Sequence, residues 1–148
     1  MNRYPAWWDT SITVYNRYED ALTHVVTWYK TQLTGNFWQY ICDKVNIGET
    51  VLETEKIICR IPENDKFLEK YQWVALTNDK MADYFTLGVD DIIVKGAVDD
   101  VIDEYTAGRR SSDLIEKYKA LQGCMEIKSV SNNTETGRGM PHYKATGL

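Results

Sequence analysis

Short segments rich in β-branched and aromatic residues recur along this chain, with turn-forming residues between them. In residues 11–18, Ile12 and Val14 fall on one side of an extended chain, and Thr13 and Tyr15 fall on the other. A period of two is the pattern of a β-strand. Many short strands must pair with one another, so this pattern favours an antiparallel all-β architecture.

Further strand patterns follow at 25–33, 37–42, 49–52, 56–61, 92–96, 125–130 and 142–146. A polar connection at 19–24 and the turn-forming pair Gly35-Asn36 join the first three, which indicates a meander. We therefore predict a mainly β fold of seven or eight short strands in a single domain, 1–148. Its form is an antiparallel barrel or sandwich.

One helix is expected near the C-terminal part, at 113–121. Ser111 or Ser112 can cap it, and Gly123 ends it. Its apolar face has the helical spacing and consists of Leu114, Ile115, Tyr118 and Leu121. Within 66–87 neither period is evident, so we expect irregular structure with one short helix at most. Residues 1–10 are predicted to form an N-terminal arm, and 62–90 and 97–110 extended loops.

Charge and cysteine content exclude some classes of protein. The net charge is −5, and the only dense basic pair is Arg109-Arg110, which disfavours a surface that grips phosphates. The three cysteines include no CxxC, a pattern typical of reduced thiols in a cytoplasm. No apolar run reaches the length of a signal peptide core or a membrane span.

The residues that carry catalysis or bind metals are sparse. Only His24 and His142 are present, and no known metal-ligand spacing occurs. Cys124 and His142 form a conceivable nucleophile pair, but a core thiol and a surface imidazole are the favoured interpretation. We expect no catalytic, cofactor-binding or metal-binding residues.

The densest charge feature is acidic and consists of Asp90, Asp91, Asp99, Asp100, Asp103 and Glu104. Acid–base catalysis needs one carboxyl group with a raised pKa in an apolar pocket. Adjacent acids at a strand start and in a loop more often form a solvated face. We favour the solvated face over a catalytic site.

Aromatic residues suggest contact surfaces. Trp7 and Trp8 follow Pro5 ahead of the first strand, and an arm carrying them can dock onto a neighbouring subunit. The residues expected at interfaces are Tyr4, Trp7, Trp8, His142 and Tyr143.

The beginning and end of the chain resemble minor capsid and head-closure proteins encoded in prophage structural gene clusters of Gram-positive bacteria. The resemblance rests on soft strand patterns that span most of the chain: residues 12–18, 27–31 and Phe37-Trp38, then 91–96, the helix at 113–121, 127–130 and 141–147.

The resemblance implies a β-barrel subunit of a phage neck. Such subunits form a ring with copies of themselves below the portal and adaptor proteins, retain packaged DNA, dock the tail proteins and bind no cofactor. It implies a virion location after assembly in the host cytoplasm. By analogy, 62–90 and 97–110 reach toward the channel or neighbouring rings. The residues that would line the channel, with only transient contact to double-stranded DNA because like charges repel, are Asp90, Asp91, Asp99, Asp100 and Asp103.

Three alternatives remain open. Another virion component, such as a tail terminator, decoration or minor capsid protein, would contact different partners. A small hydrolase would gather the carboxylates between Asp90 and Glu104 in a deep pocket. A single-strand nucleic-acid binder would expose aromatic side chains along a basic groove.

Overall fold

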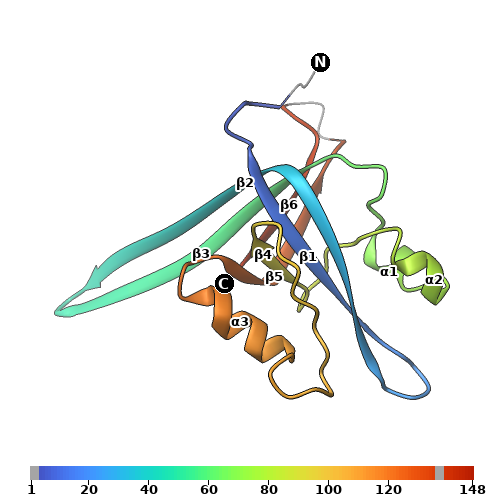
Figure 1. Ribbon diagram of the computed structural model, residues 1–148. Coiled ribbons are helices and arrows are strands. Elements are labelled where there is room, and N and C mark those ends of the chain that lie inside the picture. The colour runs from blue at the N-terminus through green and yellow to red at the C-terminus, as the bar shows by residue number, and fades with distance from the viewer. Residues whose placement is uncertain (1–3, 136–138) are drawn as a thin grey trace.

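Six strands form a closed antiparallel barrel in the computed structural model, which describes residues 4–135 and 139–148 (Figure 1). Their order around the barrel is β1-β2-β3-β6-β5-β4, and each neighbouring pair is antiparallel. This confirms the mainly β barrel prediction. The bounds are β1 Thr10–Glu19, β2 Val26–Ile47, β3 Thr50–Pro62, β4 Ile92–Lys95, β5 Cys124–Asn133 and β6 His142–Gly147.

The described part of the chain has fewer strands than predicted because two pairs of expected strands are continuous. β2 includes both 26–33 and 37–42, and Gly35 lies inside it with a φ of 73°. Glycine adopts positive φ readily, so the chain bends there without ending the strand. β2 pairs with β1 as far as Asn36 and with β3 from Phe37 onward. β3 likewise includes both 50–52 and 56–61.

The alternation predicted for the first strand is present. Ile12 and Val14 point into the barrel, where they join a core that includes Ile57, Ile93 and Met125. Tyr15 belongs to a second cluster, which packs against the helix α3 (Ser111–Lys119) through Leu114. α3 begins and ends two residues before the predicted helix, and it covers one outer face of the sheet.

Segment 97–110 contains no helix or strand, as a loop was predicted there, but it lies against the barrel instead of extending away from it. The Tyr15 hydroxyl donates a hydrogen bond to the Asp100 carbonyl at 2.7 Å, and the Val98 N–H donates to Thr13 Oγ1 at 3.0 Å. Ile102 is buried in the second cluster. The buried Ile102 side chain and the hydrogen bonds to Thr13 and Tyr15 of β1 therefore hold this segment in place.

Segment 62–90 is also folded back, which contradicts the second loop prediction. It contains two helices of four residues each, α1 (Lys70–Trp73) and α2 (Asn78–Met81). Three of its large apolar side chains, Trp73, Met81 and Phe85, are fully buried. A helix of four residues has only about one turn, so its apolar side chains cannot recur with the helical period of 3.6 residues. This is why the sequence of this segment shows no helical periodicity.

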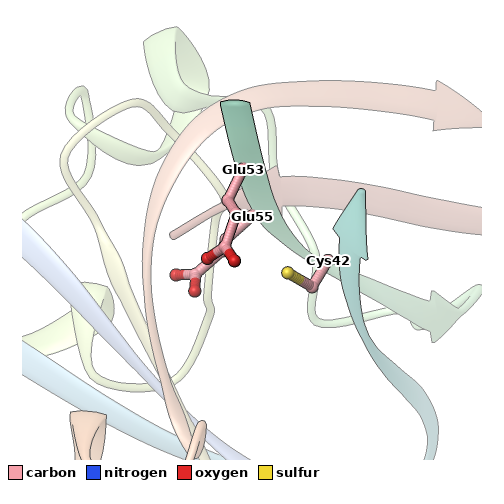
Figure 2. Close-up of side chains that lie close together, drawn as sticks. All are labelled: Cys42, Glu53 and Glu55. Atoms are coloured by element: carbon pink, nitrogen blue, oxygen red, sulfur yellow. The ribbon is translucent and has the colours of Figure 1, made fainter. Parts of the chain in front are cut away.

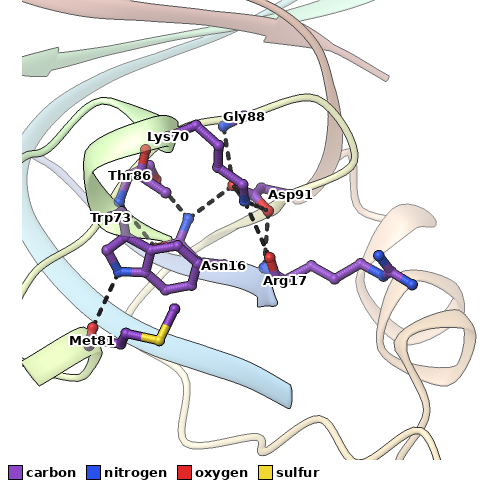
Figure 3. A network of polar contacts seen from close by, with 8 residues as sticks. All are labelled: Asn16, Arg17, Lys70, Trp73, Met81, Thr86, Gly88 and Asp91. Atoms are coloured by element: carbon purple, nitrogen blue, oxygen red, sulfur yellow. Dashed lines mark hydrogen bonds and ion pairs between the residues drawn. The ribbon is translucent and has the colours of Figure 1, made fainter. Parts of the chain in front are cut away.

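A buried carboxylate fixes this segment to the barrel (Figure 3). The Asp91 oxygens accept hydrogen bonds from Asn16 Nδ2 at 3.0 Å, Arg17 N at 2.9 Å and Gly88 N at 3.0 Å. Lys70 Nζ of α1 lies 3.2 Å from both oxygens. Burial raises the pKa of Asp91, and the Lys70 charge and these donors oppose that rise. Asp91 is thus a structural residue, and the prediction that it lines a channel is wrong.

Replacing this carboxylate should be costly. We expect Asp91→Ala to lower the free energy of unfolding by about 3–5 kcal/mol, because Lys70, Asn16 and two backbone N–H groups lose their acceptor. Urea unfolding measures the effect. The control, Asp99→Ala, removes an exposed carboxylate and should change stability by less than about 0.5 kcal/mol. Equal effects of the two substitutions would contradict the structural role of Asp91.

Gly147 permits barrel closure where β6 lies between its neighbours. It pairs with Ile57 of β3 and Ile127 of β5. A Cβ atom at this position would lie 2.8 Å from the Glu126 carbonyl carbon and 2.9 Å from Met125 Cγ, and it would also clash with the Glu126 carbonyl oxygen. No residue with a Cβ atom fits here without moving the β5 backbone.

Gly147→Ala is therefore expected to lower the free energy of unfolding by about 1–3 kcal/mol through overpacking. Gly123→Ala is the matched control, since a Cβ there would meet its nearest atom, the Tyr118 carbonyl oxygen, at an ordinary 3.5 Å. Thermal unfolding of the two variants side by side tests the prediction. A Gly147→Ala protein as stable as Gly123→Ala would show that the β5 backbone yields easily.

Candidate interaction site

A β-hairpin extends beyond the barrel, and we call its residues 41–56 the hairpin arm. Its two strands pair without interruption from Ile41↔Lys56 to Ile47↔Thr50. Figure 1 shows it projecting on the side opposite α1 and α2. β1 pairs with β2 only as far as Asn36, and β6 pairs with β3 only from Ile57 onward. Within the described chain, each arm strand thus has one edge without a strand neighbour.

Three apolar side chains gather near the tip of one face of the hairpin arm, and the half of that face nearer the barrel carries Asp43, Thr54 and Lys56. Val45 and Leu52 lie directly opposite each other, and Ile47, two residues from Val45, lies on the same face. Their exposed fractions are 50%, 47% and 59%. The other face carries Lys44, which lies 3.5 Å from Glu53 in an exposed ion pair. The arm is therefore amphipathic only near its tip, where Val51 adds one exposed apolar side chain to the polar face.

An uncovered apolar face at the end of a two-stranded ribbon is energetically unfavourable in isolation. A lone hairpin is marginally stable in water. Covering a Val, Leu or Ile side chain gains about 1.5–3 kcal/mol each, and open strand edges pair readily with another chain. These physical features are those of a surface that binds another polypeptide.

The N-terminal arm does not offer the predicted interface in full. Trp8 is buried against its own chain, with ring centroids 5.3 Å from Tyr4, 6.1 Å from Phe37 and 5.9 Å from His142. The Tyr4 hydroxyl donates to the Pro141 carbonyl at 2.6 Å. The expectation that Trp8 docks onto a neighbour is wrong, since it fixes the start of β1 to β6. Residues 1–3 of the predicted arm lie outside the described residues.

The other predicted interface residues differ in exposure. Tyr143 is buried and stacks on Phe67 with a centroid distance of 3.9 Å, so its predicted interface role is wrong. His142 is partly buried, with Nδ1 2.7 Å from the Met140 carbonyl oxygen and Nε2 3.2 Å from Asn133 Nδ2. Trp7 is 68% exposed and stays available for a partner.

The predicted acidic residues do not form one cluster. Asp90 is exposed just before β4, next to the buried Asp91. Asp99 and Asp100 line a cavity of about 430 Å³, which is also lined by the cations Arg109, Arg110 and Lys117. Asp103 stabilises a turn by accepting from the Thr106 hydroxyl at 2.7 Å. Positive side chains thus balance the acids of this cavity.

The electrostatics of this cavity do not favour acid catalysis. Lys117 and Tyr118 donate hydrogen bonds to the Asp100 carboxylate and lower its pKa. A general acid requires the opposite shift. The Cys124–His142 pair is not assembled either, because Cys124 packs in the cluster beneath α3 and burial raises its pKa to about 12.

Sequence reasoning missed the hairpin arm and its exposed thiol. Cys42 is exposed, whereas Cys59 and Cys124 are buried. The available signal was Gly48, a turn-forming residue between the two arm strands. Residues equidistant from the Gly48-Glu49 turn face each other, so Cys42 pairs with Glu55 and Val45 with Leu52. Polar residues at 43–44 and 53–55 interrupted the strand pattern and hid the arm's length.

Comparisons with known proteins identify the family. None of the helices in 4–135 or 139–148 has the length and hydropathy that a bilayer crossing requires. Neither curated proteins nor solved structures gave a match. Residues 7–148 match "Family of unknown function (DUF6751)". Because this match covers nearly all of the chain, the protein belongs to the DUF6751 family.

Proposed function

We propose that this protein is a structural subunit of a bacteriophage neck, a head-closure or head–tail joining ring, and that the hairpin arm joins neighbouring copies. The observation that carries the proposal is the uncovered apolar face formed by Val45, Ile47 and Leu52 on a ribbon that projects from a closed barrel. In a ring, the next subunit covers that face.

The barrel and the hairpin arm differ in a way that supports this role. The barrel buries its own core and closes its own sheet, so its folding does not depend on the arm. The arm carries exposed apolar side chains and open strand edges, which a neighbour can bury and pair. The proposed location in a phage neck rests on the resemblance of the strand and helix pattern to head-closure proteins. This resemblance also implies portal, adaptor and tail proteins as further partners.

The charge of the chain is compatible with a DNA channel. The net charge is −5, and the exposed side chains of Asp90 and Asp99 would repel a passing duplex. Such a surface permits only transient contact with packaged DNA. The hairpin arm is equally consistent with a role as another virion component, such as a tail terminator or minor capsid protein. In that role the arm would bind different partners.

The substitution Leu52→Lys tests the role of the arm. It places a charge in the centre of the apolar face, so we expect it to prevent assembly while leaving the exposed arm and the barrel folded. Cryo-electron microscopy of the chain mixed with a phage portal–adaptor complex should show a symmetric added ring for the wild type and none for Leu52→Lys. Circular dichroism should be the same for both.

The matched control is Leu22→Lys, the same substitution at an exposed leucine in the β1–β2 connection. It should assemble as the wild type does. Assembly of Leu52→Lys to the wild-type extent would remove the arm from the interface. A wild-type chain that adds no ordered layer to the portal–adaptor complex would overturn the neck assignment.

A further inference from the structure

The polar face of the hairpin arm brings three metal-ligating side chains together (Figure 2). Cys42 Sγ and one carboxylate oxygen each of Glu53 and Glu55 all lie within 4.8 Å of one another. Figure 2 shows the thiol and both carboxylates directed toward the same space. All three residues are exposed, so an ion can reach them from solvent.

The strand pairing determines this arrangement. Cys42 is the direct cross-strand partner of Glu55, and Glu53 lies two residues away on the same face. The ladder around them has no register shift, so the three backbone positions are fixed relative to one another. A tetrahedral ion with ordinary bond lengths holds its ligands about 3.5 Å apart, which small rotations of two glutamate side chains can reach.

The neighbours of the cluster also suit an ion. Tyr40 lies two residues before Cys42 on the same face, and its phenol hydrogen-bonds the Glu55 carboxylate. Glu55 also lines a cavity of about 200 Å³ at the base of the arm, together with Lys119 and Gln122. The three cluster residues are themselves open to solvent, which leaves room for a fourth ligand such as water. Lys44 forms an exposed ion pair with Glu53 and competes with any bound cation.

We propose that Cys42, Glu53 and Glu55 form a Zn²⁺ site on the hairpin arm. A thiolate favours zinc over magnesium or calcium, both of which prefer oxygen ligands in greater number. On binding, the Cys42 thiol releases its proton to solvent and a Zn–S bond forms, with no change of oxidation state. The ion cross-links the two arm strands and stiffens them. This site is independent of the proposed neck function.

Zinc titration of the full-length, reduced protein by calorimetry tests the site. The wild type should bind one equivalent of Zn²⁺, and Co²⁺ should give a thiolate-to-cobalt charge-transfer band. Cys42→Ser should abolish that band and weaken Zn²⁺ binding by about 100-fold or more, since even outer partners of a metal site contribute about 10–100-fold. Glu53→Gln and Glu55→Gln should each weaken it by at least about tenfold.

Two further variants separate a built site from general negative charge. Asp43→Asn removes a carboxylate from the opposite face of the same strand and should leave Zn²⁺ affinity unchanged. Lys44→Gln removes the competing cation and should tighten binding by up to about fivefold, the effect of one exposed ion pair.

Three results would overturn the site: no saturable binding by the wild type, wild-type binding by Cys42→Ser, or equal loss in Asp43→Asn. Because Leu52 lies on the other face of the arm, Leu52→Lys should still bind Zn²⁺, so failure of the assembly test and failure of the metal test are distinguishable.

Discussion

The Asp91 carboxylate fixes the segment that carries α1 and α2 to strands β1 and β4 of the barrel. It lies at the start of β4 and accepts from β1, from the segment before β4 and from the lysine of α1. Asn16, one of its donors, also donates to the Thr86 carbonyl at 2.6 Å and accepts from the Thr86 N–H at 3.2 Å. A buried charge is tolerated only when its oxygens are satisfied, so the positions of all these partners are coupled. The two short helices, which would not be stable alone, are ordered through this coupling and through Trp73.

The long second strand separates two functions. It pairs with β1 as far as Asn36, pairs with the barrel part of β3 from Phe37 to Tyr40, and continues into the hairpin arm from Ile41. Because the chain bends at Gly35, one continuous strand pairs first with β1 and then with β3, and no connecting loop is needed. The bend also places the hairpin arm outside the barrel, where one face can contact protein while the other faces solvent. The apolar face and the thiol–carboxylate cluster therefore lie back to back on the same two strands.

The sequence predicted those features that depend on local pattern. The alternation of Ile12, Thr13, Val14 and Tyr15 predicted β1, and the spacing of Leu114, Ile115 and Tyr118 predicted α3 within two residues. It did not predict that Gly35 bends a strand instead of ending it, because a positive φ is compatible with both. It did not separate Asp91 from Asp90, because burial depends on partners up to 75 residues away in sequence, such as Asn16. The metal-ligand cluster was invisible for the same reason, since Cys42 and Glu55 become neighbours only through register.

The position of β6 has a consequence for the order of synthesis. This strand lies between β3 and β5, yet all the other strands precede it along the chain. Until His142–Gly147 leaves the ribosome, β3 and β5 cannot complete their pairing, and Trp8 lacks His142 as a contact. Closure therefore follows the synthesis of the other five strands of the barrel. Before closure, the nascent protein exposes the unpaired edges of β3 and β5 as well as its hairpin arm. Premature association with other chains is therefore most favoured during translation.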